Sequence, residues 1–278
     1  MRRTQLRRWI VGAVAIAVSV LVFLVPFAFI LITASKTTQG ASLLGFSLPD
    51  KWVLWDNIVT VLSDRNGLLV RAFVNSIVLT VASVTIMVVL SAMVGYILSR
   101  RQSRWNGVIT FFVLAGLIVP PAVVPTIWVL QRLGLFKTLP GLVLIEATFG
   151  LSFCILLFRA FVATIPRELD EAAVIDGAGP IRLFFRVVLP LLKPVIVTSI
   201  VVQSVAVFND FANPLYFLPG DQNATVQLTL YNYAGGMAAN QYNLLFADIL
   251  LITIPPLIMY IFFNRQIVAG MTSGAVKG

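Results

Sequence analysis

Long runs of apolar residues, each bounded by polar or charged residues, dominate this chain. Three of the runs contain no charged residue, and they cover 9–34, 72–99 and 105–131. A helix needs about 20 apolar residues to cross the hydrocarbon core of a bilayer. Uninterrupted runs of this length differ from the short alternating segments of an outer-membrane barrel. The pattern therefore predicts three transmembrane helices.

Three further runs each contain one acidic residue, and they cover 139–158 with Glu146, 194–218 with Asp210 and 242–263 with Asp248. Each run is still long enough to span a bilayer. No repeat, low-complexity tract or soluble domain interrupts the series. We therefore predict an all-α integral membrane protein in which residues 1–278 form a single domain with six transmembrane helices.

The basic residues orient these predicted helices, because short cytoplasmic loops are enriched in Lys and Arg. Fourteen of the 20 basic residues lie in the N-terminal segment, the second-to-third connection, the fourth-to-fifth connection and the C-terminal tail. The other six lie in the remaining connections. Both termini are therefore expected on the cytoplasmic side.

The overall composition agrees with a membrane protein, because 59% of the residues are hydrophobic and only 11% are charged. The mean hydropathy of +0.96 is far above that of an ordinary soluble domain. The net charge of +9 is explained by basic flanks that face anionic lipid. No nucleic-acid-binding motif accompanies this charge, so we expect membrane lipid and no nucleic acid as a partner.

Residue types that carry catalysis are scarce. The chain has no His, and its single cysteine, Cys154, lies inside an apolar run. No Lys follows a Gly, as the phosphate-binding loop of an ATPase requires. We therefore predict no catalytic residue, no metal site and no cofactor in this chain. If ATP drives the protein, another chain binds the nucleotide.

Prolines interrupt two of the apolar runs. Pro120, Pro121 and Pro125 lie in the third run, and Pro255 and Pro256 lie in the sixth. Proline removes a backbone donor and predicts a kinked or broken helix. Such a break is either a harmless kink or part of a transport route, and the sequence leaves both interpretations open.

Within the fourth-to-fifth connection, the loop 166–190 contains four of the 11 acidic residues. Pro166 and the acids that follow it suit the first turn of a helix. Gly177 and Gly179 predict a left-handed turn that ends this helix, and Pro180 can begin a second one. The expected product is a helix, a tight turn and a helix in the cytoplasm. Its acids face either water or a partner.

The sequence EAAVIDGA at 171–178, followed by LPL at 189–191 and by Pro194, resembles the EAA signature of ABC importer permeases. This resemblance implies that the loop 166–190 contains a coupling helix. Such a helix docks into a cleft of a cytoplasmic ATPase subunit and passes its movement to the membrane spans. The resemblance assigns this coupling to Glu171, Ala172, Ala173, Asp176, Gly177 and Ala178.

Two further stretches narrow the family. FNDFANPLYFL at 208–218 is similar to the fifth span of carbohydrate permeases, and GMTSGAVKG at 270–278 is similar to the C-terminus of a maltose-type permease group. The resemblance implies a permease subunit that forms half of the pathway of a binding-protein-dependent sugar importer in a bacterial inner membrane. The implied partners are a second permease in a heterodimer, a dimer of ATP-binding subunits that use ATP and Mg, and an extracytoplasmic sugar-binding protein.

Ionisable groups inside a bilayer are costly and face cavities or partner helices. In the fifth run, Asn209, Asp210 and Asn213 can offer oxygens and amides to sugar hydroxyls, and they can equally form hydrogen bonds between helices. Glu146 and Asp248 are weaker candidates for such contacts, because we expect them near the ends of their spans, within reach of water.

The resemblance also implies two peripheral contacts. The outer connection 219–241, with Gly235 and Gly236 near its end, is expected to face the sugar-binding protein. The C-terminal residues Ser273, Gly274 and Lys277 are expected to contact the ATPase.

Three other function classes stay open at this point: an ABC permease for a non-sugar solute, a membrane enzyme that acts on lipid-linked substrates, and a structural or sensory subunit. The FNDF and GAVKG stretches argue against the first class. An enzyme site would normally show His, paired acids or a metal-ligand set at a span end. In this chain the acidic residues are clustered in the loop 166–190 and not at a span end, which argues against an enzyme.

Overall fold

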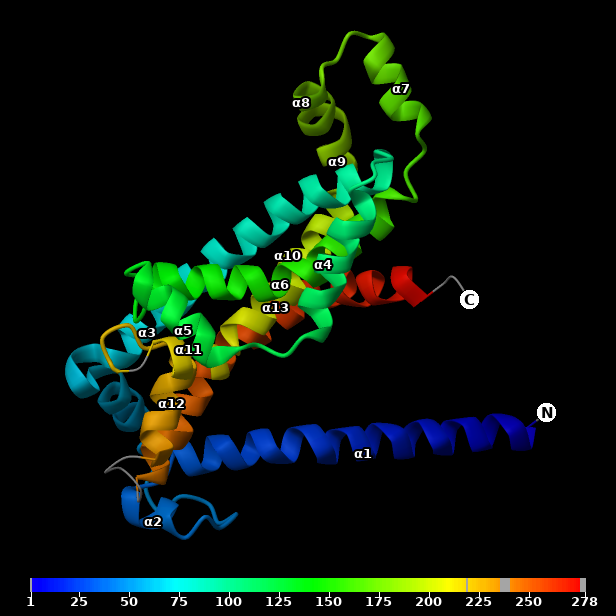
Figure 1. The fold of residues 1–278 in the computed structure, drawn as a ribbon. Helices are drawn as coiled ribbons and strands as arrows, with labels where there is room; N and C mark the ends of the chain where they lie inside the picture. The colour runs from blue at the N-terminus through cyan, green and yellow to red at the C-terminus, as the bar shows by residue number, and fades with distance from the viewer. Residues whose placement is uncertain (1, 219, 236–240, 276–278) are drawn as a thin grey trace. The chain divides into compact units, whose positions relative to one another are not determined.

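The structure is a computed structural model that describes residues 2–218, 220–235 and 241–275. It divides into two compact units, unit 1 (Met1–Val70 and Thr229–Ile254) and unit 2 (Arg71–Leu228 and Pro255–Gly278). Every regular element among the described residues is a helix (Figure 1). The helices are α1 Arg2–Ala34, α2 Thr38–Ser42, α3 Leu54–Arg100, α4 Asn106–Ile118, α5 Val123–Arg132, α6 Leu139–Val162, α7 Glu168–Ile175, α8 Pro180–Leu183, a π-helical turn Phe184–Val188, α9 Leu189–Leu191, α10 Lys193–Phe208, α11 Ala212–Phe217, α12 Val226–Gly235 and α13 Tyr242–Ala275.

Four of the described helices are long and apolar enough to cross a membrane, which makes the chain a multi-pass membrane protein. Two bent helix pairs would raise the number to six if each pair formed one span. The first pair, α4 and α5, is bent by 113°, and the break contains Pro120 and Pro121, as the sequence predicted. In contrast, α13 continues through Pro255 and Pro256.

The second bent pair joins residues 180–191 to α10 at 73°. The predicted fifth span, 194–218, corresponds to α10 and α11 with a short break between them. The predicted second span also differs, because α3 starts at Leu54 rather than at residue 72. Non-helical backbone at 64–67 separates its two parts.

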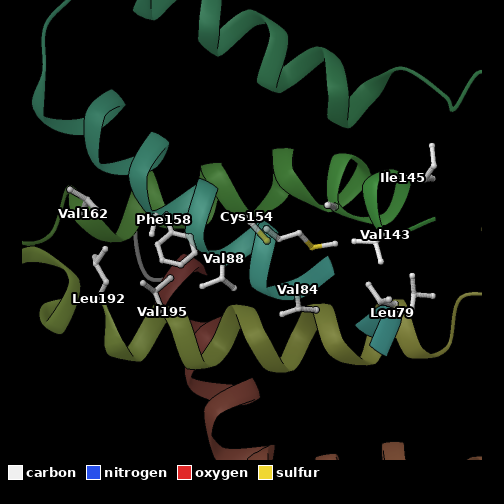
Figure 2. Packing of buried hydrophobic residues seen from close by; sticks show 14 of the residues in the cluster. Leu79, Val84, Val88, Val143, Ile145, Cys154, Phe158, Val162, Leu192 and Val195 are labelled. Atoms are coloured by element: carbon white, nitrogen blue, oxygen red, sulfur yellow. The ribbon is translucent and has the colours of Figure 1, made fainter. Parts of the chain in front are cut away.

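In unit 2, α6 is the helix around which the others pack, because it contacts α4, α10 and α11. Its buried face includes Cys154 and Phe158, both with no exposed surface. These side chains join Leu79 and Val88 of α3 and Val195 of α10 in one apolar core (Figure 2). This core holds in place the polar groups described below.

The C-terminal part of α3 lies directly against α6 at Gly95. A Cβ atom at this position would be 2.8 Å from the Cβ of Phe158 and 2.9 Å from the backbone nitrogen of Arg159. Real Cβ atoms essentially never approach so closely, and one of the two neighbouring atoms belongs to the backbone of α6, which cannot move aside as a flexible side chain can. Only glycine allows the two helices this spacing.

We therefore expect Gly95→Ala to destabilise the protein by about 1–3 kcal/mol, the usual cost of overpacking a filled core. Thermal unfolding of the detergent-solubilised protein measures this loss. Gly107→Ala in the first turn of α4 is the matched control, since a Cβ added there would meet no atom within 4 Å. Equal melting temperatures for the two variants would contradict the close approach.

In unit 1, Asn57 connects three segments of the chain. Its side-chain amide donates hydrogen bonds to the carbonyl oxygens of Ala34 (2.8 Å) and Lys36 (2.9 Å), at the end of α1. Its oxygen accepts a hydrogen bond of 2.8 Å from the amide of Asn243, at the start of α13. Because Asn57 is buried, these bonds satisfy polar groups that water does not reach.

Candidate functional site

The acidic segment of the fourth-to-fifth connection forms the helix–turn–helix that the sequence predicted. The helix α7 has Glu168, Asp170 and Glu171 in its first turn, where acids interact favourably with the helix dipole. It ends in a Schellman motif, in which the amide of Ala178 donates to the carbonyl of Ala173 at 2.9 Å. Gly177 supplies the required left-handed backbone with φ of +79°.

One detail of this turn was predicted wrongly. Gly179 does not adopt a left-handed conformation, because its φ is −68° and its ψ is 165°. A residue before proline is driven to this extended region by the proline ring, and Pro180 follows directly. Gly179 therefore begins the second helix rather than ending the first.

Apolar side chains are exposed at the tip of this helix–turn–helix. Ile175 at the end of α7 is 84% exposed, and Ile181 in α8 is 77% exposed. The side chains of Val174 and Phe185 are more than half exposed beside them. Exposed apolar groups gathered in this way mark contact surfaces. Figure 1 shows that α7 and α8 stand at one end of unit 2, beyond α9.

The predicted coupling residues lie on this tip or directly beneath it. Glu171, Ala172, Asp176 and Gly177 are exposed, whereas Ala178 is half-buried and Ala173 is buried. Ala173 and Ala178 belong to the apolar core of unit 2, where they pack with Phe184. The tip is therefore an exposed surface on a packed base.

The base of the segment is tied to α3 by Arg100, the last residue of that helix. The Arg100 Nε lies 2.8 Å from Asp170 Oδ2, in a pair whose side chains are 12% and 15% exposed. The contact is ionic rather than a directed hydrogen bond, since Nε has no hydrogen-bond partner of good geometry among the described residues. Arg100 Nη2 donates to the carbonyl of Ile165 at 2.8 Å.

A second contact reinforces this connection one turn earlier on α3. The Tyr96 ring lies 5.6 Å from the Phe184 ring, measured between centroids. Phe184 is buried and follows α8 directly. Both legs of the helix–turn–helix are thus in contact with the end of α3. We call Arg100, Asp170, Tyr96 and Phe184 the α3 clamp.

A second group of polar residues lies inside unit 2, where α6, α10 and α11 meet. Asn213 Nδ2 donates to Glu146 Oε1 at 3.2 Å. Asp210 Oδ1 accepts the backbone amide of Ala212 at 2.9 Å, which begins α11. Glu146 and Asp210 line the same cavity, whereas Asn209 bonds to the carbonyl of Val205 and does not line it.

The positions of two acids differ from expectation. Glu146 is 5% exposed and Asp248 has no exposed surface, so neither reaches water from a span end. From the sequence, Glu146 was only a weaker candidate for substrate contact than Asp210. The only indication of a site at Glu146 in the sequence was a single carboxyl group in an otherwise apolar run. Its hydrogen-bond partner, Asn213, lies more than 60 positions away along the chain.

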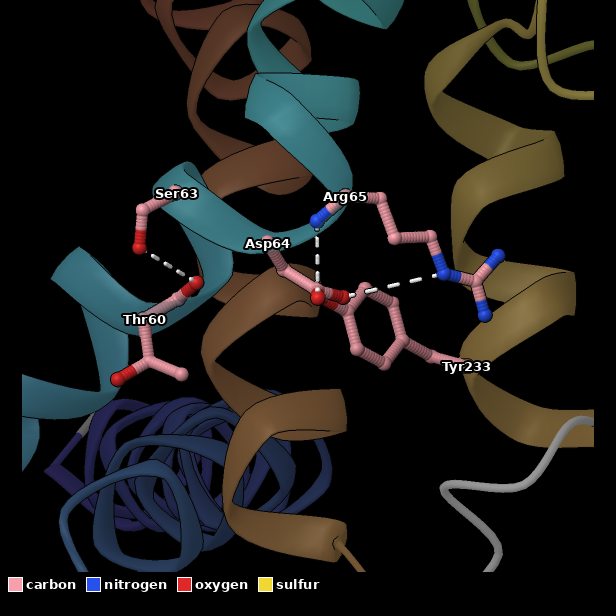
Figure 3. A network of polar contacts seen from close by, with 5 residues as sticks. All are labelled: Thr60, Ser63, Asp64, Arg65 and Tyr233. Carbon is pink, nitrogen blue, oxygen red and sulfur yellow. Dashed lines mark hydrogen bonds and ion pairs between the residues drawn. The ribbon is translucent and has the colours of Figure 1, made fainter.

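A third polar group lies in unit 1, at the break in α3 (Figure 3). The hydroxyl of Tyr233 donates to Asp64 Oδ2 at 2.6 Å, and the Arg65 Nε lies 4.0 Å from the same oxygen. Burial raises the pKa of Tyr233, and the hydrogen bond and negative charge of Asp64 raise this pKa further. This bond attaches the predicted binding-protein-facing connection, through α12, to α3.

Several predicted contact residues lie close to the ends of the described segments or outside them. Gly235 is the last residue of α12, and Ser273 and Gly274 lie in the last turns of α13. Gly236 and Lys277 are outside the described residues.

Comparisons with known proteins identify the family of this chain. A model of the family described as "binding-protein-dependent transport system inner membrane component" matches residues 87–273. The chain is 31% identical to the diacetylchitobiose uptake system permease protein NgcG of Streptomyces coelicolor, over 92% of this chain and 85% of that protein. It is 33% identical to the trehalose transport system permease protein SugB of Mycobacterium tuberculosis, over 77% of this chain and 79% of that protein.

The fold also has a match among solved structures. One chain of a bacterial ABC transporter involved in the import of the acidic polysaccharide alginate superposes with a TM-score of 0.79. The superposition covers 95% of this chain and 97% of that chain, at 23% sequence identity.

Proposed function

Because the chain belongs to the family of binding-protein-dependent transport system inner membrane components, we propose that it is a permease subunit of an ATP-driven sugar importer. Members of this family are transport components and not enzymes. The sugar assignment is supported by relatives whose names include diacetylchitobiose, trehalose, and melibiose, raffinose and stachyose. The observation that carries the proposal is the exposed apolar tip at Ile175 and Ile181, which lies inside the matched residues.

The proposed topology has six spans with both termini in the cytoplasm. The four apolar helices and the bent pairs supply enough hydrophobic length for six crossings. The excess of basic residues in alternate connections supports the orientation. The proposed location is a bacterial inner membrane, with the loop 166–190 on the cytoplasmic side.

In this proposal the helix–turn–helix is the coupling element that docks into a cytoplasmic ATP-binding subunit. Its exposed Ile175 and Ile181 supply the apolar area that a stable contact buries. The exposed acids around them add charge complementarity, which governs the choice of partner. Nucleotide and Mg are bound by the partner, so this chain itself needs no cofactor.

The remaining partners follow from the same assignment. A second permease subunit completes the pathway, and an extracytoplasmic sugar-binding protein delivers the substrate. The connection around Gly235 and Gly236 is proposed to face that binding protein. The Tyr233–Asp64 bond attaches the preceding helix, α12, to α3. Ser273, Gly274 and Lys277 contribute to the contact with the ATPase.

The mechanism follows from rigid contacts at the base of the coupling element. Closure of the ATPase pair on ATP moves the docked tips of the two permeases toward each other. The α3 clamp and the shared core pass this movement to α3 and α6, because packed interiors are bistable rather than continuously deformable. The spans then change from an inward-facing to an outward-facing arrangement.

A mild-detergent pull-down of the tagged chain from its host, followed by mass spectrometry, tests the assignment. We expect an ATP-binding subunit and a second permease to accompany the chain. The membrane fraction of a strain that expresses the tag on an unrelated membrane protein is the control. Recovery of the intact chain without any ATPase would contradict the proposed function.

A further inference from the structure

A cavity of about 340 Å³ lies in unit 2 between α6 and α10. Its walls include Glu146, Phe149 and Phe153 from α6, Gln203 from α10, Met87 from α3, and Asp210 just after α10. Phe153 is 42% exposed, so the cavity opens to the surface on that side. Its volume lies within the range of about 300–1,000 Å³ that is usual for small-molecule sites.

The polar groups of this cavity are acceptors. Glu146 and Asp210 present carboxyl groups, and Glu146 Oε1 accepts a hydrogen bond from Asn213. Two neighbouring carboxyl groups keep at least one negative charge between them even where they share a proton. None of the described residues that line the cavity is basic.

Gln203 adds a third acceptor to the wall of the cavity. Its side-chain nitrogen donates to Cys154 Sγ at 3.3 Å, which directs the other end of the amide away from Cys154. The residue as a whole is only 7% exposed. A Cβ added at Gly150, which is itself a cavity residue, would lie 3.3 Å from this oxygen. The amide oxygen therefore lies beside the cavity, where it can accept a hydrogen bond from a ligand hydroxyl.

The apolar walls of the cavity can pack against the ring of a bound sugar. Phe149 and Phe153 are four residues apart on α6 and therefore lie on the same face of that helix. Aromatic rings pack against the C–H faces of a pyranose, while its hydroxyl groups donate to carboxyl and amide oxygens. Met87 fills the remaining wall with a flexible side chain.

On this geometry, and resting on the function proposed above, we propose that the cavity is a subsite for an uncharged sugar unit and that its carboxyl pair excludes sugars bearing carboxylates. Hydroxyl donors fit the three acceptors, whereas a uronic acid would place a second negative charge in the same space with no basic residue to balance it. The subsite therefore selects within the class of sugars, independently of the binding protein.

The test measures sugar binding to the purified importer complex without its binding protein, by ligand-observed saturation-transfer NMR. The neutral probes are trehalose, raffinose and diacetylchitobiose, and the acidic probe is an alginate disaccharide. We expect at least one neutral sugar, and not the alginate disaccharide, to bind the wild type. Glu146→Gln and Gln203→Leu should each weaken that binding about fivefold, the effect of one hydrogen bond.

The double variant Glu146→Gln with Asp210→Asn removes the charge while it keeps the shape of the cavity, and it should admit the alginate disaccharide. Asp248→Asn is the matched control, since it neutralises another buried carboxyl that does not line the cavity. It should bind the sugars as the wild type does.

The subsite is overturned if the wild type binds the acidic probe as tightly as the neutral ones, or if the cavity variants bind neutral sugar unchanged. It is also overturned if the complex imports a neutral sugar from the binding protein but binds none in the NMR assay. A complex that imports no sugar at all instead contradicts the proposed function.

Discussion

Sugar uptake is expected to be abolished by Gly177→Asp, while the protein still inserts into the membrane. Gly177 has φ of +79° and closes the Schellman motif at the end of α7. An L side chain in this conformation costs about 1 kcal/mol of strain, which is too little to unfold the chain. A Cβ added at this position would meet no atom of this chain within 4 Å. A large functional loss must therefore arise where the new side chain meets the docked ATPase.

The matched control is Gly134→Asp, in the turn after α5. Gly134 has φ of +69° and equally open space where a Cβ would lie, so the backbone strain is comparable. It lies outside the coupling element, and we expect near-normal uptake from this variant. Uptake of the labelled substrate and co-purification of the ATPase are measured for both. If Gly177→Asp transports and retains the ATPase as Gly134→Asp does, the docking surface does not include this turn.

Breaking the α3 clamp should separate ATPase binding from transport. We expect Arg100→Ala and Asp170→Ala each to reduce uptake at least tenfold, while the ATPase subunit still co-purifies. Removal of one partner leaves the other charge buried without compensation, which costs about 3 kcal/mol. The exposed tip that docks is left intact, whereas its connection to α3 is lost. ATP hydrolysis should then continue without a matching rate of uptake.

The exchanged pair, Arg100→Asp with Asp170→Arg, distinguishes coupling from a general loss of stability. The exchange should restore part of the uptake, because it re-forms the ion pair but not the Arg100 bond to the carbonyl of Ile165. Arg104→Ala, an exposed arginine in the same connection as Arg100, is the control. Normal uptake by the single variants, or no recovery on exchange, would argue against the clamp.

Local features of the structure were predictable because short-range forces decide them. The break between α4 and α5 follows from missing backbone donors at Pro120 and Pro121, and the end of α7 follows from the freedom of Gly177. The one wrong detail of the turn, Gly179, has a local cause too, since the following proline restricts it. Family membership was also predictable, because EAAVIDGA is contiguous in the chain.

Only the tertiary structure decided which distant residues meet. The sequence indicated that Arg100 is a cytoplasmic flank residue, but not that it pairs with Asp170. Likewise it indicated that Glu146 and Asp210 are isolated acids in separate spans, but not that one cavity contains both. Helical periodicity and residue chemistry determine which face of each helix is apolar. Tertiary packing decides which other helix each of these faces contacts. The sequence by itself therefore determined the helices, the turn chemistry and the family. The tertiary structure decided the α3 clamp and the acidic cavity, because the clamp and the cavity each depend on contacts between residues more than 60 positions apart.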